Sequence, residues 1–206
     1  MSGNMSRKNV VIDYARIADG EDFLNLLEIS AGEFMRALFG PKMRQTVSVL
    51  YTYGNTIFGV QSVVFARLHG SNVGMYTGYA PWRSPLMFMR TGWVCLRHLR
   101  RTTSPRLSRL LAGAKMSIFR PGTFYLSNIA VYDGYRDMGI GRLLMEHLEM
   151  ILKKKDMKRI VLNVETENTA AISFYSRLGY SRGNRSRVVK ISRKRFEFYR
   201  MEKRIG

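Results

Sequence analysis

The sequence predicts an α/β fold built on a mixed sheet, and three observations support this prediction. Strand-like apolar runs alternate with segments whose apolar residues recur at helical spacing, most clearly after residue 123. Turn-forming Gly, Pro and Asn separate these segments. The 206 residues are 46% hydrophobic, which is enough apolar material for a substantial core. An order of strand, helix, strand, helix, strand is typical of α/β proteins.

The first 80 residues predict one strand, three helices and a hairpin. Asp19 is expected to cap the first helix, and Gly40-Pro41 stops the second. Two apolar runs are separated by His69-Gly70-Ser71-Asn72, which is a hairpin signal. The expected elements are a strand over 10–16, helices over 20–29, 31–39 and 42–53, and strands over 61–68 and 73–79.

Residues 81–122 interrupt this order with four prolines and a concentration of positive charge. From Pro81 to Phe124 there is no Asp or Glu. The nine basic residues are Arg83, Arg90, Arg97, Arg100, Arg101, Arg106, Arg109, Lys115 and Arg120. We interpret the segment as two short basic helices inserted between strands. The first, over 86–99, is expected to be a covering helix, with a substrate-side lid or a membrane-surface helix as alternatives.

After residue 123 the pattern predicts alternating strands and helices. The apolar run 124–131 predicts a strand buried on both faces. In the next helix one face carries the residues Ile140, Leu143, Leu144, His147, Leu148, Ile151 and Leu152. His147 is therefore expected to be a core histidine rather than a ligand. The remaining elements are a strand over 159–165, a helix over 169–178 that Asn168 caps and Gly179 ends, and closing strands over 187–192 and 195–201.

The single cysteine and the hydropathy of the chain indicate its expected cellular compartment. Cys95 is the only cysteine, so an intramolecular disulfide is impossible and a reducing cytoplasm is expected. Its apolar neighbours predict a packing role. No apolar run approaches the roughly 18 residues of a membrane span, and residues 1–9 lack a secretory apolar stretch. We expect a single cytoplasmic domain over 1–206.

The loop Tyr135-Arg-Asp-Met-Gly-Ile-Gly-Arg142 joins the strand 124–131 to the following helix. Backbone N–H groups at a helix start are unpaired, and the helix dipole makes them attractive to anions. Glycine allows close approach of an anion to the backbone. The loop is therefore interpreted as a pyrophosphate cradle. It lacks both the third glycine of dinucleotide folds and the Gly-Lys-Ser/Thr of nucleoside-triphosphate loops.

Four segments, taken together, resemble the GNAT superfamily of acetyl-CoA-dependent N-acetyltransferases. They are Phe124-Tyr-Leu-Ser-Asn-Ile-Ala-Val131, Tyr135-Arg-Asp-Met-Gly-Ile-Gly-Arg142, Asn163-Val-Glu-Thr-Glu-Asn168 and Ala171-Ile-Ser-Phe-Tyr-Ser-Arg-Leu-Gly-Tyr180. The resemblance covers a CoA-binding core over about 122–182. It implies a mixed, mostly antiparallel central sheet flanked by helices, with the basic helical insertion over about 81–122 between strands three and four.

The same resemblance implies residue roles and no metal. Tyr175 would be the general acid that protonates the leaving CoA thiolate, and Asn168 would bond the pantetheine region. The main chain of Ile129, Ala130 and Val131 would pair with the pantetheine arm. The pyrophosphate would be held by Arg136 and by the backbone of Asp137, Met138, Gly139, Ile140, Gly141 and Arg142.

The general base departs from the family pattern. Several protein-acetylating relatives place a glutamate where this chain has Asn163, and an amide cannot take a proton. Glu165 lies on the same face two residues on, so it is the candidate base, with Glu167 as an alternative. Both could instead be solvated carboxylates, with ordered water deprotonating the amine.

The implied reaction is direct attack of a primary amine on acetyl-CoA in a ternary complex. The alternative is a CoA-binding or nucleic-acid-associated module without chemistry. The net charge of +19 attracts anions, so we expect an acceptor that carries negative charge, and nucleic acid is a further possible partner. The fold class is also compatible with a homodimer.

Overall fold

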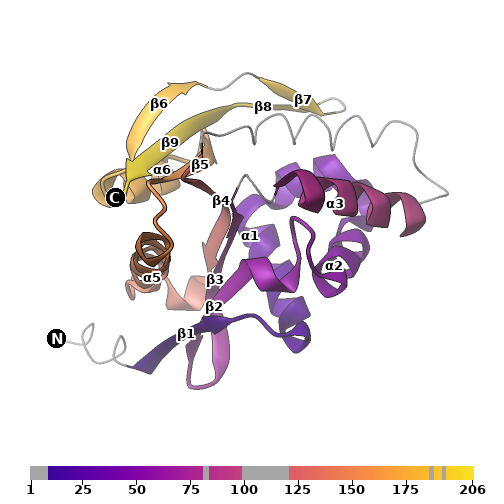
Figure 1. Cartoon of the computed structure of the whole chain (residues 1–206), viewed down its shortest axis with the longest axis horizontal. Helices are drawn as coiled ribbons and strands as arrows, with labels where there is room; N and C mark the ends of the chain where they lie inside the picture. The colour runs from indigo at the N-terminus through magenta and orange to yellow at the C-terminus, as the bar shows by residue number, and fades with distance from the viewer. Residues whose placement is uncertain (1–8, 81–83, 99–120, 186–187, 192–193) are drawn as a thin grey trace.

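The computed structural model describes residues 9–80, 84–98, 121–185, 188–191 and 194–206 (Figure 1). Its central feature is a seven-stranded sheet in the order β1-β2-β3-β4-β5-β9-β6. The β4–β5 pair is parallel and the other pairs are antiparallel, which confirms the expected mixed, mostly antiparallel sheet. The strands are β1 (Val10–Tyr14), β2 (Val63–Leu68), β3 (Ser71–Tyr79), β4 (Thr123–Val131), β5 (Arg159–Glu165), β6 (Ser181–Arg185) and β9 (Phe198–Arg204). A separate hairpin contains β7 (Val189–Ile191) and β8 (Lys194–Phe196).

Helices cover both faces of the sheet (Figure 1). Alternate residues of β2 show why, because successive side chains of a strand point to opposite faces. Val63 and Phe65 belong to an apolar cluster with the first helices, whereas Val64 and Ala66 belong to a second cluster with the later ones. The first group comprises α1 (Gly20–Phe39), α2 (Met43–Tyr53) and α3 (Ser84–His98), and the second comprises α5 (Ile140–Lys154) and α6 (Thr169–Arg177).

The two helices expected over 20–29 and 31–39 are present as one kinked helix, α1. Ala31 has non-helical torsions, φ −153° and ψ 30°, inside it. The interruption therefore lies where the sequence predicted a boundary, while the chain continues in the same element. The kink brings Ser30 close to β4, where its Oγ accepts a hydrogen bond from Asn128 Nδ2 at 3.1 Å.

The predicted capping role of Asp19 is wrong. Asp19 stands at the N-cap position of α1, but its side chain makes no capping bond there. Its carboxylate instead accepts from the N–H of Arg16 at 2.7 Å, from Arg67 at 2.8 Å and from Asn72 at 3.1 Å. Arg67 and Asn72 belong to β2 and β3, so this buried carboxylate joins the hairpin to α1.

The insertion contains the first of its two expected helices. α3 occupies Ser84–His98, close to the predicted 86–99, and the second expected helix lies outside the described residues. Val94 and Cys95 are buried on the inner face of α3. Burial raises the pKa of Cys95 to about 11, so the thiol is a protonated packing group, as expected.

The elements between β4 and α6 begin and end close to the predicted bounds, but the expected burial of strand 124–131 on both faces is wrong, because from Leu126 to Val131 only alternate residues are fully buried. Asn168 caps α6, with Oδ1 accepting from the N–H of Ala171 at 3.0 Å, and Gly179 follows the helix in the left-handed region at φ 84°. His147 faces the sheet, where Nδ1 lies 3.1 Å from Tyr76 Oη. The closing strands differ. The expected strand 195–201 is divided at Glu197 into β8 and β9, and β6 was not predicted.

The Asp19–Arg67 pair predicts a measurable stability defect. Replacing Asp19 by Asn leaves the buried Arg67 charge unpaired, so we expect the free energy of unfolding to fall by about 3 kcal/mol. Burial alone would raise the Asp19 pKa, but the hydrogen bonds and charge of Arg67, with the N–H of Arg16 and Asn72, lower it to about 2. The contribution is therefore complete above the unfolded pKa near 4 and disappears as pH falls toward 2.

Urea unfolding as a function of pH measures this defect. The matched control is Asp13→Asn, which breaks an exposed pair with Arg16 and should cost less than about 1 kcal/mol. Equal losses in the two variants would contradict a special role for the buried pair.

Candidate functional site

The site is built around the point where β4 and β5 separate. The two strands pair in parallel only over Thr123–Leu126 and Arg159–Leu162. Beyond that, β4 continues along β3 to Val131, while β5 continues along β9 to Glu165. The sheet is therefore open between the end of β4 and the end of β5.

The open edge of β4 carries backbone donors. The N–H of Tyr132 donates to Val73 O of β3 at 3.0 Å. Because N–H groups alternate in direction along a strand, those of Ile129 and Val131 face the open edge. Ala130, between them, is buried and faces β3 with its N–H. The geometry is that of a strand ready to pair with one more extended chain.

A local irregularity accompanies the opening. The β3–β4 register shifts between Thr77 and Gly78, leaving Ser127 without a partner on β3. A Cβ on Gly78 would lie 2.4 Å from the carbonyl oxygen of Tyr125, so only glycine fits where β3 comes this close to β4. Ser127 Oγ donates to Asn128 Oδ1 at 3.0 Å, and Asn128 in turn bonds Ser30. These contacts hold the kink of α1 against the open end of β4.

A cavity of about 440 Å³ lies at this opening. Five of the residues singled out from the sequence line it, namely Ile129, Asn163, Glu165, Asn168 and Tyr175. Its walls also include the aromatic residues Phe34, Phe58, Tyr79, Phe88, Tyr125 and Phe198. Among the described lining residues, the charged ones are all acidic: Glu28, Glu33 and Glu165.

The glycine loop lies at the far end of the opening, next to the tip of β4. Asp137 and Gly139 have positive φ, 61° and 78°, and α5 begins at Ile140 with no side-chain cap. The first N–H groups of α5 therefore lack both an intrahelical and a capping partner. A Cβ on Gly141 would lie 3.3 Å from the Phe174 ring and 4.0 Å from Val131 Cγ2, so the loop is packed closely against α6 and β4.

The two arginines of the loop make local ion pairs. Arg136 Nη2 lies 2.8 Å from Asp133 Oδ1, and Arg142 Nε lies 2.7 Å from Glu146 Oε1. All four side chains are largely exposed, so these pairs are weak. The pairs leave Arg136 and Arg142 able to exchange partners for an anion.

Tyr175 is a buried tyrosine at the inner end of the cavity. Its ring packs against Phe174 and Tyr180 at centroid distances of 5.3 and 5.7 Å. Burial, and to a lesser degree the neighbouring Tyr125, raise the Tyr175 pKa above its ordinary value. The hydroxyl is therefore neutral at physiological pH and retains a proton to donate.

Glu165 is a half-buried carboxylate at the end of β5. Burial raises its pKa, and the charges of Glu33 and Glu167 raise it further. Glu167, in contrast, is exposed and is not among the lining residues. Asn163, also on β5, donates from Nδ2 to Tyr125 Oη at 3.2 Å. Of the two candidate bases, Glu165 is the one that lines the cavity.

Sequence reasoning missed the contribution of α1 and of Tyr125. Glu28 pairs with Arg36 and Arg44, at 3.2 and 2.6 Å, and Glu33 pairs with Lys194 of β8 at 2.7 Å. The amphipathic pattern of α1 indicated which side is buried, but it carried no signal that its kink meets β4 and β5. Tyr125 lay inside a quoted motif, yet only the observed Asn163 contact distinguishes it from a core aromatic.

Comparison with known proteins agrees with this geometry. The sequence profile of the Acetyltransferase (GNAT) family matches residues 61–180, more than half of the chain. The chain belongs to this family. The [ribosomal protein bS18]-alanine N-acetyltransferase of Escherichia coli K12 is 43% identical over 56 residues, which are 27% of this chain and 38% of that relative. The match thus spans well under half of the relative's length.

Solved structures share the fold. An N-acetyltransferase from Staphylococcus aureus Mu50 superposes with a TM-score of 0.70 at 14% identity, over 93% of this chain and 99% of the other. The PaiA N-acetyltransferase of Thermoplasma acidophilum, solved in complex with coenzyme A, gives a TM-score of 0.54 at 14% identity, over 95% and 98% of the two chains. At these identities the likeness establishes the architecture, and the roles of individual residues rest on the geometry described above.

The loop geometry predicts that alanine substitutions at two nearby glycines have different effects on the free energy of unfolding. Gly139→Ala puts a Cβ into the left-handed region at φ 78°, so we expect the free energy of unfolding to fall by about 1–2 kcal/mol. Gly134, in the preceding turn, has open space around its Cβ position and no positive φ, so Gly134→Ala is the matched control. Thermal unfolding followed by circular dichroism measures both. A control loss as large as that of Gly139→Ala would contradict the proposed strain.

Proposed function

We propose that the protein transfers the acetyl group of acetyl-CoA to a primary amine, by direct attack within a ternary complex. The observation that carries this proposal is the open β4 edge, with a cavity at one end and the uncapped start of α5 at the other. Such an arrangement suits a ligand with an extended arm and a phosphorylated end.

Binding of acetyl-CoA is assigned mainly to backbone groups. The outward N–H groups of Ile129 and Val131 would pair with the acetylated pantetheine arm as a strand pairs with an added peptide, Val131 with the pantetheine and Ile129 with the thioester end. The amides from Asp137 to Arg142 and the Arg136 side chain would hold the pyrophosphate. Asn168 uses Oδ1 for its cap, so its Nδ2 is the group we assign to the pantetheine.

The proposed chemistry uses two side chains and one amide. Glu165 accepts a proton from the acceptor's ammonium group, directly or through water. The neutral amine then forms a C–N bond to the thioester carbon, while the outward N–H of Ile129, which lines the cavity near Val131, stabilises the developing charge on the carbonyl oxygen. The C–S bond breaks as the carbonyl re-forms, Tyr175 gives its proton to the CoA thiolate, and the proton still carried by the newly acetylated nitrogen returns to Tyr175, directly or through water.

The charged residues that line the cavity change the kind of amine acceptor that we propose. The net charge of +19 predicted an acceptor carrying negative charge near its amine. The described charged residues lining the cavity are glutamates; Glu28 and Glu33 are in ion pairs, so we assign the short-range charge interaction with the acceptor to Glu165. We therefore propose an acceptor that enters as an ammonium ion, with any negative charge located away from the cavity.

The rival function is CoA binding without chemistry. Asn163, in place of a carboxylate, is the observation that favours it. The decisive measurement is release of free thiol from acetyl-CoA with a broad panel of amines. If calorimetry detects CoA binding while no amine causes thiol release, the enzyme proposal fails and the binding module is supported.

Tyr175 is expected to control turnover. Because the neutral phenol supplies the leaving-group proton, Tyr175→Phe should lower kcat roughly 100-fold and leave the KM for acetyl-CoA almost unchanged. The matched control is Tyr180→Phe, a buried tyrosine in contact with Tyr175 that does not line the cavity. Thiol-release kinetics give both constants. Full activity in Tyr175→Phe would remove this residue from the mechanism.

The pH profile distinguishes the two candidate bases. Burial raises the Glu165 pKa, so activity should rise with pH as this carboxyl loses its proton. Glu165→Gln should abolish that rise and lower kcat/KM roughly 10- to 100-fold at neutral pH. Glu167→Gln, two residues on and exposed, should keep the rise with pH and move it only to slightly lower pH, because the Glu167 charge no longer raises the Glu165 pKa. If neither variant changes the profile with the same acceptor, water alone removes the proton.

A further inference from the structure

The outer face of α3 is an apolar stripe, which we define by Leu86, Met89, Trp93 and Leu96. These residues follow one another at spacings of three, four and three, so they lie along one line of the helix. They are exposed to 75%, 71%, 47% and 47%, respectively. The opposite face of α3, with Met87, Thr91, Val94 and Cys95, is buried. The helix is therefore apolar on two sides, and only one of these sides is buried against the rest of the protein.

Cations accompany the stripe. Arg90 and Arg97 each follow a stripe residue by one position, and α3 contains no Asp or Glu. The Arg97 guanidinium lies 5.3 Å from the centre of the Trp93 ring, and that of Arg90 lies 5.5 Å from the Tyr53 ring. Arginines stacked on aromatic rings beside exposed Leu, Met and Trp match the boundary between lipid headgroups and acyl chains.

A large groove lies along the stripe: Leu86, Met89 and Trp93 line it, and Tyr79 lines both this groove and the cavity at the β4–β5 opening. Its volume is about 1250 Å³, and its floor includes Tyr79, Phe124, Leu152 and Met157. Among the described lining residues the charged ones are Arg90 and Lys155, both cationic. An apolar floor with a cationic rim is complementary to an amphiphile that has an anionic head and a hydrocarbon tail.

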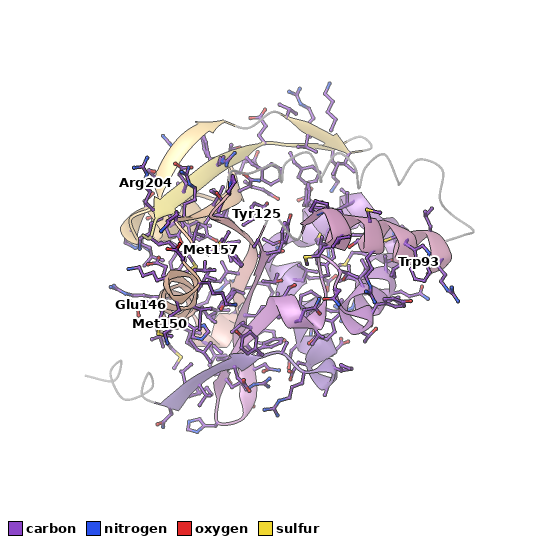
Figure 2. The ribbon with its side chains drawn as sticks, viewed as in Figure 1. Trp93, Tyr125, Glu146, Met150, Met157 and Arg204 are labelled. Carbon is purple, nitrogen blue, oxygen red and sulfur yellow. The ribbon has the colours of Figure 1, made fainter. Side chains whose placement is uncertain are left out.

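From these observations we infer that the outer face of α3 docks on the surface of an anionic lipid bilayer. The stripe enters the headgroup–acyl boundary, and Arg90 and Arg97 contact anionic headgroups. No described helix is long and apolar enough to cross a membrane, so this would be attachment to the surface. Trp93 lies at the outer edge of the molecule, on the side away from Met150 of α5 (Figure 2).

Vesicle flotation tests the proposal on the full-length protein. We expect binding to vesicles of phosphatidylcholine containing about one third phosphatidylserine, weak binding to phosphatidylcholine alone, and weakening as salt rises from about 0.1 to about 0.5 M. Leu86→Ser/Met89→Ser should reduce binding by roughly tenfold or more, because it removes apolar area that would leave water. Arg90→Gln/Arg97→Gln should reduce binding by a similar factor and remove the preference for anionic lipid.

Matched controls come from α5. Met150→Ser removes an exposed methionine, and Lys153→Gln/Lys154→Gln removes two exposed cations, both at α5. These variants should bind vesicles like the wild type. Equal losses in controls and α3 variants, or no binding by the wild type, would overturn the proposal. So would α3 variants that lose affinity for an RNA oligonucleotide while keeping it for vesicles, because the stripe would then be a nucleic-acid surface.

A second measurement remains decisive where an α3 variant fails to fold. Brominated acyl chains should quench the tryptophan fluorescence of the bound wild type, and Trp93→Phe should lose most of that quenching. Quenching that is absent, or unchanged in Trp93→Phe, would place the stripe outside the bilayer and end the proposal.

Discussion

The separation of β4 from β5 is the constraint on which the site depends. Each strand has a competing partner: β3 holds β4 to Val131, and β9 holds β5 to Glu165. If the two strands stayed paired over their full length, the N–H groups of Ile129 and Val131 would bond to β5 and the cavity would be closed. The Asn128–Ser30 contact and the crossing at Gly78 maintain the opening from the α1 side. The opening is thus a consequence of sheet pairing and of one kinked helix acting together.

The elements that the sequence predicted well are those specified by local interactions. The cap between Asn168 and Ala171 spans three residues, and Gly179 ends α6 through its own torsion. The wrong predictions concern residues whose contacts are determined by partners far away in the sequence. Asp19 lies 48 residues from Arg67 and 53 from Asn72, so a capping pattern was a poor guide to its true contacts. The division at Glu197 similarly reflects which sheet the chain joins on each side, and strand propensity does not encode that choice.

The candidate site shows the same division between local and distant information. Gly139 and Gly141 could be predicted because torsion and close packing limit those positions to small residues. Tyr175 and Asn168 lie seven residues apart, about two helical turns, which puts them on one side of the helix, and both line the cavity. Glu28 and Glu33 could not be predicted, because hydrophobic periodicity orients α1 relative to the core without saying which strand its kink meets. For that reason the acidic lining of the cavity could not be predicted, although the net charge of the chain was known from its composition.

The described helix of the insertion, α3, has a defined position in the fold. α3 is fixed from within by Thr91, whose Oγ accepts from the N–H of Ile57 at 3.1 Å while donating to Met87 O at 2.6 Å. Phe88 lines the acceptor cavity and meets Tyr79 edge-on at 5.9 Å, whereas Met89, the next residue, belongs to the exposed stripe. One helix therefore separates a cavity lined by glutamates from an outer surface bearing arginines. The described charged residues that line the cavity are acidic and those of α3 are basic, so attraction of anions to the outer face does not require an anion in the cavity. The large positive charge of the chain is consequently compatible with the proposed entry of an ammonium ion at the cavity.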